Sequence, residues 1–473
     1  MLPQKDVSKA GPETGSGTGL KRDLGAWAAA SIVVGTVIGS GIFLVPSTMM
    51  QRVGSAQMVF VVWIAGGLLS LAGALSYAEL AAAMPEAGGE YVYLREAYGP
   101  IWGFLYSWTQ MWVAKSGSIA ALATGFFLYF ADFFHQFDRV AYVVPLPLGP
   151  RGGPVEILYG QIGAIVLILA LAWLNYFGVR FGGQVQTAVT AIKVILIAAL
   201  IVIGLVAQAL PPANPATSPQ LPGLTLAGFV AALVAALWAY DGWNNAAMVG
   251  SEIRQPRRNL PRALIGGTIA VIVIYLLANA AYFHVLGAAR VAGEQRVAAA
   301  MMSRIFGAGG GHAVSVAAMI SMFAALNGSI LSGARVPYAA ARGGHFFSAL
   351  KRVDPRRHTP ANAIVALSLW SCLLVLSGRY DDIFNLVIFA SWILYAMTAA
   401  AVIVLRKKRP DLSRPYFTVG YPAVPVLFIG GAIILLASTL FDRPRESILG
   451  IGIMILGLPF YLYWKRKAEK EYL

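Results

Sequence analysis

Two short polar breaks interrupt apolar stretches of this chain, and they hold the residues best suited to bind a ligand. Gly39-Ser40-Gly41 interrupts the first stretch, and Tyr240-Asp241-Gly242 interrupts the second about 200 residues later. A helix broken inside an apolar phase leaves backbone N–H and C=O groups without partners. This costs on the order of several kcal/mol unless those groups line a cavity or bind a ligand. The two breaks therefore predict a buried binding site.

The two breaks offer opposite electrostatic environments. Gly39 and Gly41 permit an unwound turn and a close backbone approach. The helix that restarts near Ile42 presents free N–H groups and a positive dipole end, which suit a carboxylate. The second break ends a helix with free carbonyl groups, which suit an ammonium group. Together the breaks would hold both poles of an amino acid, whereas the alternative is that the glycines only allow close helix packing.

Asp241 and Trp238 carry specific hypotheses within the second break. We expect Asp241 to line the site, with a cap on the broken helix as the alternative. Trp238 stands three residues before Asp241. We expect it to act as a gate over the site, with an interfacial packing role as the alternative.

Three basic residues lie inside predicted apolar spans, where charged groups are costly and usually functional. Lys193 is expected either to change its protonation state or to act as a permanent cation, and a structural tie to backbone carbonyls is compatible with both. Lys115 and Arg335 are expected to be structural pins.

Three glutamates flank one end of the second span. Glu79, Glu86 and Glu90 are expected to form ion pairs with Arg95 rather than to touch a ligand.

The composition requires a membrane to bury these segments. Charged residues make up 12% of the 473 residues, apolar residues 58%, and the mean hydropathy is +0.68. The charged share is about half the roughly 25% of soluble domains, so we predict a polytopic membrane protein. The net charge of +15 lies in short loops between spans, which indicates topology anchors and not nucleic-acid binding. The single cysteine, Cys372, excludes an intrachain disulfide and a cysteine-based metal site. The five histidines are scattered, so we predict no enzyme, no metal and no cofactor.

The hydrophobic pattern predicts an all-α protein with twelve transmembrane helices. Residues 1–23 are expected to be a disordered cytoplasmic tail and residues 465–473 a second cytoplasmic tail. The excess of Lys and Arg in alternate loops places both termini inside. Two broken spans in corresponding positions of two halves are typical of a transporter's substrate site. The predicted spans are 24–50, 57–84, 99–131, 155–175, 184–209, 225–252, 263–287, 311–341, 361–378, 382–405, 422–441 and 446–464.

Several motifs in order carry a family resemblance over residues 25–465. The chain is similar to the amino acid–polyamine–organocation superfamily, and closest to prokaryotic-type members of the L-type amino acid transporter family. The motifs are Gly35-Thr-Val-Ile-Gly-Ser-Gly-Ile-Phe43, Tyr77-Ala-Glu-Leu80, Gly88-Gly-Glu-Tyr91, Tyr98-Gly-Pro100, Ala239-Tyr-Asp-Gly-Trp-Asn244, Pro256-Arg-Arg-Asn-Leu-Pro261, Asn327-Gly-Ser329 and Arg409-Pro-Asp-Leu-Ser-Arg-Pro415.

The resemblance implies a five-plus-five inverted repeat with broken helices 1 and 6. Residues 24–209 would form helices 1–5, residues 225–405 the inverted repeat, and residues 422–464 helices 11 and 12. It also implies alternating-access transport of L-amino acids in the cell (inner) membrane, as sodium-independent exchange. Neutral substrates are expected, and cationic ones stay open because some cationic-substrate members also have aspartate at the position of Asp241. The alternatives are a proton-coupled symporter, with Lys193 as the titrating group, and an amino acid sensor that does not transport.

The resemblance also assigns roles to individual residues. Lys193 matches a lysine that takes the place of a sodium ion between helices 1 and 8, so we expect a coupling role there, with Trp238, Asn327 and Ser329 as further coupling or gating residues. Eukaryotic members use a cysteine after helix 3 to bridge a glycoprotein heavy chain. Residues 132–154 contain no cysteine, so we expect no disulfide-linked heavy chain. The expected substrate-binding residues are Val37, Gly39, Ser40, Gly41, Ile42, Trp238, Ala239, Tyr240 and Asp241.

Overall fold

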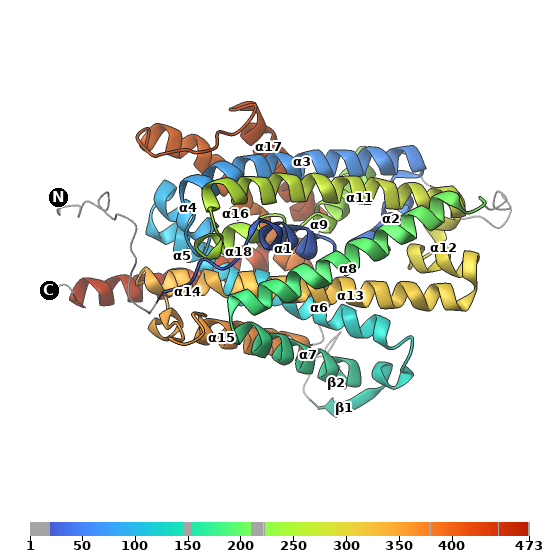
Figure 1. Ribbon diagram of the computed structural model, residues 1–473, viewed down its shortest axis with the longest axis horizontal. Helices are drawn as coiled ribbons and strands as arrows, with labels where there is room; N and C mark the ends of the chain where they lie inside the picture. Colours follow the sequence, from blue (N-terminus) through green and yellow to red (C-terminus); the bar gives the residue numbers. More distant parts are fainter. Residues whose placement is uncertain are drawn as a thin grey trace.

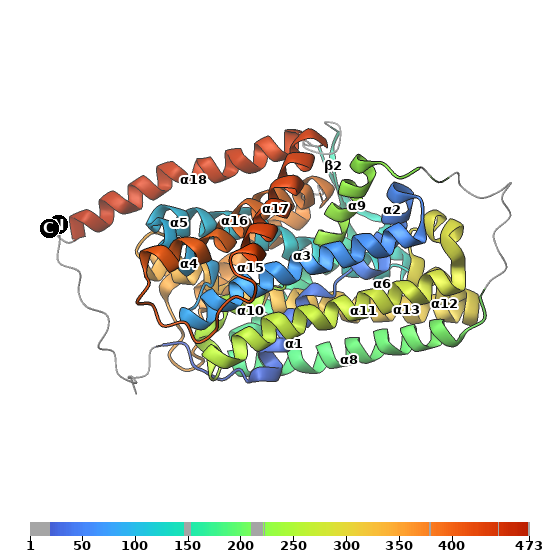
Figure 2. The ribbon, with the colours of Figure 1, turned by 90° about the horizontal axis from the view of Figure 1, so that it is seen from above.

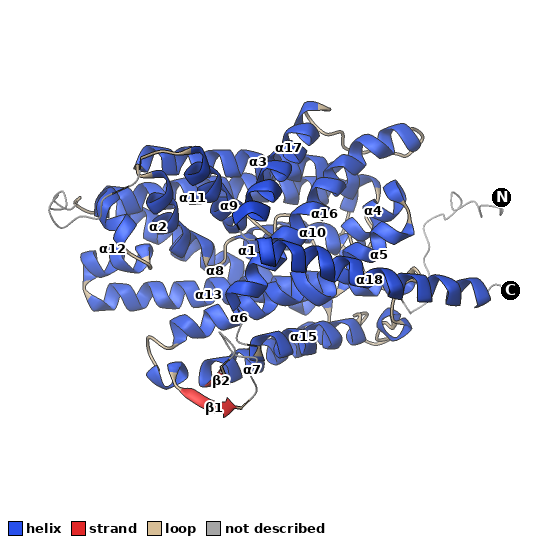
Figure 3. Cartoon of the chain, turned by 180° about the vertical axis from the view of Figure 1, so that it is seen from behind, coloured by secondary structure: helices blue, strands red, loops and turns tan. Residues whose placement is uncertain are grey.

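The structure is a computed structural model that describes residues 19–145, 153–209, 221, 223–377, 380–442 and 444–471. Long helices run side by side along the longest axis of the molecule (Figure 1). The chain is an all-α polytopic membrane protein, as predicted. In the described residues its strands form only one small hairpin, drawn in red in Figure 3.

The helices of the first half begin before the first break and end with a long apolar helix. They are α1 (Ala26–Val37), α2 (Gly41–Val53), α3 (Ala56–Ala83), α4 (Glu90–Tyr98), α5 (Pro100–Thr109), the π-helical turn η2 (Gln110–Ala114), α6 (Lys115–Phe130), the 3-10 turn η3 (His135–Asp138), α7 (Tyr159–Tyr176) and α8 (Val179–Val206).

The helices of the second half begin before the second break. They are α9 (Leu226–Ala239), α10 (Asn245–Met248), η5 (Gly250–Glu252), α11 (Pro256–Gly293), α12 (Val297–Phe306), α13 (Ala308–Gly333), α14 (Arg335–Arg342), η6 (Ser348–Lys351), α15 (Ala361–Leu376), α16 (Tyr380–Lys408), α17 (Ala423–Asp442) and α18 (Pro444–Glu471).

Both predicted breaks are present, and they lie next to each other. The first span is bent by 41° between α1 and α2. The second stops at Ala239 and resumes as helix at Asn245. Helix α2 packs against α9 and α1 packs against α10. The half before one break therefore meets the half after the other, so the two broken segments run antiparallel.

The described residues contain nine helices that are long and apolar enough to cross a membrane, or ten with the bent α1–α2 pair. The predicted spans at 225–252 and 361–378 correspond to shorter apolar helices, Leu226–Ala239 and Ala361–Leu376. The count of twelve therefore stays a prediction. Another short apolar helix, α12, lies in the connection between two predicted spans and was not predicted.

A β-hairpin follows α6, with its first strand in the predicted loop 132–154 and its second at the start of the predicted span 155–175. Strand β1 (Val140–Val144) pairs antiparallel with β2 (Val155–Leu158), with Val143 opposite Glu156. The valines, Tyr142 and Ile157 favour extended structure. This pattern was overlooked because the segment is short.

The two predicted tails stay predictions, and the structure describes only part of each chain end. Residues 1–18 of the predicted tail 1–23 lie outside the described residues. After them, Leu24 pairs with the segment that follows η5: its N–H donates to the Glu252 carbonyl (2.9 Å), and its carbonyl accepts from the Arg254 N–H (2.8 Å). At the other end, α18 continues to Glu471 along one edge of the molecule (Figure 2), so most of the predicted tail 465–473 is helical.

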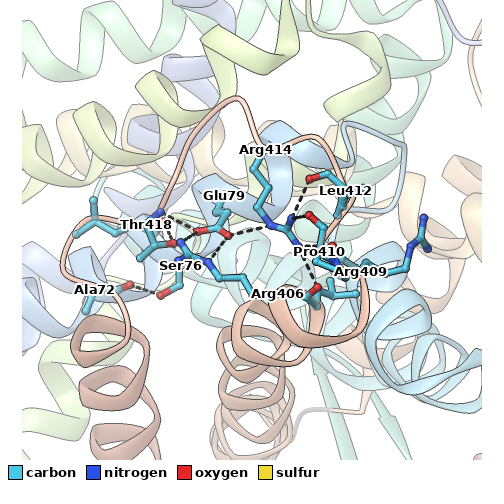
Figure 4. Close-up of polar contacts among 11 residues, drawn as sticks. Ala72, Ser76, Glu79, Arg406, Arg409, Pro410, Leu412, Arg414 and Thr418 are labelled. Carbon is cyan, nitrogen blue, oxygen red and sulfur yellow. Dashed lines mark hydrogen bonds and ion pairs between the residues drawn. The ribbon is translucent and has the colours of Figure 1, made fainter.

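The three glutamates near the end of α3 have different partners, and the partner of Glu90 is Asn244 and not the predicted Arg95. Glu86 lies 4.0 Å from Arg95, as predicted. Glu79, however, accepts two hydrogen bonds from Arg406 (2.9 and 2.6 Å) and one from the Thr418 N–H (2.8 Å), and Arg414 lies 3.5 Å away (Figure 4). This cluster joins α3 to α16 and to the loop that follows it. Pairing between helices far apart in sequence was not visible in the sequence.

Candidate functional site

A small cavity of about 80 Å³ lies where the two breaks meet. Its walls come from both breaks and from two further helices, α6 and α16. The lining residues are Thr36, Val37, Gly39, Ser40, Gly41, Gly117, Ser118, Ala121, Leu122, Trp238, Ala239, Asp241, Ser391 and Trp392. About 10–15 Å³ is needed for each water-sized group, so the cavity has room for roughly five to eight such groups.

The first break presents a helix N-terminus to this cavity. Helix α2 starts at Gly41, and the preceding Ser40 makes no side-chain cap to it. The N–H of Phe43 donates to the Ser40 carbonyl (3.1 Å), and Gly39, Ser40 and Gly41 line the cavity. The positive end of the helix dipole and its N–H groups suit a carboxylate.

Gly41 also allows the two broken helices to touch. A Cβ atom at this position would lie 2.7 Å from the Ala239 Cβ and 2.9 Å from the Ala239 Cα. Both separations are shorter than a carbon–carbon contact of about 3.5–4.0 Å. The close approach of α2 and α9 therefore requires glycine at residue 41.

Tyr275 of α11 ties the two breaks together. Its hydroxyl lies 3.0 Å from the carbonyl oxygen of Val37 and 2.8 Å from that of Ala239. The Thr36 hydroxyl likewise reaches the Gly242 carbonyl (3.0 Å), and Gly242 has a positive φ of 106°. The carbonyl groups expected to be free for an ammonium group are therefore partly engaged by side chains, and each keeps one lone pair.

Asp241 faces the cavity but is not isolated. The Tyr395 hydroxyl donates a hydrogen bond to its Oδ1 (3.1 Å). Lys115 interacts with it electrostatically and donates a hydrogen bond to Asn245 Oδ1 (2.7 Å). Lys115 thus supplies a cation beside the only carboxylate among the cavity-lining residues.

Lys193 of α8 holds the unwound end of α1. Its ammonium nitrogen donates to the carbonyls of Gly35 (2.8 Å) and Ile38 (2.5 Å), and its side chain is fully buried. Ser321 of α13 donates to the Ile38 carbonyl as well (2.8 Å). Helix α13, which corresponds to the predicted span 311–341, therefore contacts the first break through Ser321. The sequence reasoning missed this residue.

Asn327 and Ser329 lie further along α13. Asn327 Nδ2 donates to Gln186 (2.8 Å), and its Oδ1 accepts from Asn175 (2.8 Å). It therefore joins α13 to α7 and α8 and not to the first break. Ser329 is buried in the same turn. Their predicted coupling role stays a prediction.

Two of the nine predicted substrate-binding residues do not line the cavity. Ile42 is completely buried in the core beside its lining neighbour Gly41, because successive helical residues point about 100° apart. The Tyr240 side chain points away as well and donates to the Trp63 carbonyl (3.1 Å).

Six lining residues from α6 and α16 were missed. Those on α6 follow the spacing i, i+1, i+4 and i+5, which marks one helix face. No feature of the sequence distinguishes that face from the others. The six residues are Gly117, Ser118, Ala121, Leu122, Ser391 and Trp392.

The described residues contain no group of three or more His, Cys, Asp and Glu side chains placed to hold a metal ion. The site instead consists of paired helix breaks around a cavity inside a polytopic helical protein, which is the architecture of a secondary transporter. The chain belongs to the amino acid permease family, whose sequence pattern matches residues 24–458. This is a family of transporters and not of enzymes.

Individual relatives are similar over nearly the whole chain. The serine/threonine exchanger SteT of Bacillus subtilis (strain 168) is 35% identical over 459 residues, which cover 95% of this chain and 99% of that protein. The human b(0,+)-type amino acid transporter 1 is 33% identical over 477 residues, covering 99% and 93%. The human large neutral amino acids transporter small subunit 2 is 32% identical over 480 residues, covering 99% and 86%. The chain is therefore a multi-pass amino acid transporter, as the motifs predicted.

Proposed function

We propose that this protein exchanges small neutral L-amino acids, with serine, threonine and alanine as the first candidates. The observation that carries the proposal is the cavity between the two breaks. It offers a helix N-terminus for the α-carboxylate and the carbonyls of the second break for the α-amino group. Val37, Ser40 and Gly41 would contact the carboxylate, and Trp238 and Ala239 the amino end, with Trp238 as the gate.

The size and charge of the cavity favour small neutral side chains. Its volume of about 80 Å³ gives room for a ligand of few heavy atoms. The Asp241 carboxylate already has Tyr395 and Lys115 as neighbours, so a cationic side chain would have to compete with Lys115. Ser118 and Ser391 add two hydroxyl groups to the lining, which suits a hydroxylated substrate. The name of the bacterial relative points the same way.

Lys193 supports exchange without sodium. Its ammonium group already donates hydrogen bonds to the carbonyl oxygens at the unwound end of α1. A sodium ion would need such oxygen ligands. In the proposed cycle the binding site would then return across the membrane only with a second amino acid bound, and not with an ion.

The proposed location is the cell (inner) membrane with both termini in the cytoplasm, as the distribution of basic residues favours. We further propose that the protein works without a disulfide-linked heavy chain. Its one cysteine, Cys372, lies within α15 and is buried.

Counterflow in proteoliposomes tests the proposal. Vesicles are loaded with unlabelled L-serine, and uptake of labelled L-serine is measured in choline buffer, with each of the twenty amino acids as a competitor. We expect uptake only into loaded vesicles, no change when sodium replaces choline, and strongest competition by small neutral amino acids.

Each alternative gives a different result in the same assay. A proton-coupled symporter would take up label into empty vesicles when the outside is made acidic. A sensor would bind labelled serine without accumulating it. Strongest competition by arginine or lysine would refute the neutral preference.

A further inference from the structure

A second buried polar cluster lies behind the cavity, around Glu90 at the start of α4. Asn244, at the end of the second break, donates a hydrogen bond from Nδ2 to Glu90 Oε1. Both side chains are completely buried. This contact joins the first residue of α4 to the residue before α10, where the second broken span resumes.

The charges around this cluster do not balance if every acid is ionised. Lys115 is the cation that interacts with the cluster, and two carboxyl groups share it. Its stronger interaction is with Asp241 and its weaker one with Glu90. A buried carboxylate without its own cation is strongly destabilised. The charge balance therefore favours a neutral Glu90.

Two acceptor atoms in this cluster lack a hydrogen-bond donor. Within the described part of the chain, Glu90 Oε2 and Asn244 Oδ1 are buried and have no hydrogen-bond partner. The Tyr106 hydroxyl beside Glu90 is also unpaired and can donate to one of these oxygens. It has a single hydrogen for two acceptors, and buried polar atoms are nearly always paired, so one donor is still missing. One added proton satisfies both atoms, because a protonated carboxyl and a carboxamide can form two reciprocal hydrogen bonds.

We propose that Glu90 is a proton-binding site of this transporter. A proton taken from water is held on Oε2 and donated to Asn244 Oδ1, while Asn244 Nδ2 donates to Oε1. The reciprocal pair holds the start of α10 in place. When the proton leaves, two oxygen acceptors face each other and the pair is reduced to one bond.

The surroundings of Glu90 agree with a neutral acid. Burial raises the pKa of Glu90 to about 7, and this effect exceeds the opposing effects of its hydrogen bonds and of Lys115. Helix α4 lies between two membrane-capable helices and is not one itself. The titratable groups that face Glu90 come from the helices packed around it: Tyr77 of α3, Tyr93 of α4, Tyr106 of α5, Lys115 of α6 and Tyr395 of α16, with Asp241 acting through Lys115.

Infrared spectroscopy of the purified full-length protein tests the proton directly. The carbonyl band of a protonated carboxylic acid is recorded at pH 6 for the unmodified protein, for Glu90→Gln and for Glu86→Gln. Glu86 is a matched control, because its side chain is 61% exposed and lies four residues away. We expect Glu90→Gln to lose one band and Glu86→Gln to keep it. If Glu90→Gln removes no band, Glu90 is ionised and the proposal is wrong.

Thermal unfolding gives a second readout. A folded protein that holds this proton more tightly than the unfolded chain gains stability that is fully present below pH 4.5. That stability is lost as the pH rises through about 7. The unfolding midpoint of the unmodified protein should therefore fall across this window relative to Glu90→Gln. The amide of that variant can make both bonds without titrating, so parallel profiles would contradict the proposal.

A third variant covers the case in which Glu90→Gln does not fold. Asn244→Ser removes Oδ1 and leaves Glu90 in place. The acid band should then move to higher frequency, because its O–H group has lost its acceptor. An unchanged band would refute the reciprocal pair. None of these readouts uses a substrate, so they stand apart from the proposed exchange activity.

Discussion

The contact between the two broken helices can be tested by adding a single methyl group at Gly41. In Gly41→Ala the new Cβ would lie 2.7 Å from the Ala239 Cβ and 2.9 Å from the Ala239 Cα. Carbon atoms pack at about 3.5–4.0 Å, so α2 and α9 must separate by roughly 1 Å. Overpacking of this kind costs about 1–3 kcal/mol. If substrate binds where the breaks touch, its Kd should rise about 5- to 150-fold.

Equilibrium binding of labelled L-serine to the purified protein measures this effect, and the unfolding midpoint shows whether the variant still folds. Gly39→Ala is the matched control, because it adds the same methyl group to the same break. Its Cβ would meet Leu122 at 3.6 Å, an ordinary contact. We expect its Kd to change by less than about threefold, which is below about 1 kcal/mol. The larger Gly41→Val should abolish binding.

Two outcomes would refute this reasoning. Normal binding by Gly41→Ala would place the site away from the contact between the breaks. Equal losses in Gly41→Ala and Gly39→Ala would mean that lost cavity space, and not helix separation, weakens binding.

Three further substitutions probe the charged groups. Lys193→Ala should slow serine counterflow about tenfold or more while binding changes less than about threefold; unchanged counterflow would leave Lys193 a structural pin. Asp241→Asn should lower arginine and lysine transport alone if the carboxylate contacts the side chain, and all transport together if it contacts the α-amino group; no change in competition assays would make it a helix cap. Arg335→Leu leaves Glu252 buried and unpaired and should lower the free energy of unfolding by about 3–5 kcal/mol, measured by denaturant titration. Little change in that titration would contradict the importance of the pair.

The two breaks were predictable because adjacent glycine and polar residues weaken a helix inside an apolar run, and the freed backbone groups then need a cavity or a ligand. Gly39, Ser40 and Gly41 appear in the cavity wall for that reason. Ile42 and Tyr240 do not line the cavity, and a break in sequence does not indicate which side chains face inward. Their direction depends on where each helix resumes and on its packing against α3 and α11.

The missed residues depend on the relative position of helices. Ser321 and Asn327 are both polar residues on α13, six residues or about 9 Å apart along the helix. The sequence shows both, but only the packing of α13 on α1 decides that Ser321 reaches the first break. The same applies to Ser118 and Ser391, because many serines lie in apolar spans and few face the cavity.

The position of Lys193 has a consequence for the energetics of transport. Its ammonium group is tethered to α8 and holds carbonyl oxygens that could otherwise coordinate a dissolved cation. In the proposed exchange cycle this charge stays with the protein, so it carries no sodium ion across the membrane and draws no free energy from a sodium gradient. For an obligate exchanger, each amino acid gained then requires another to be given up. Such a carrier changes the composition of a cell's amino acid pool and leaves its size to other transporters.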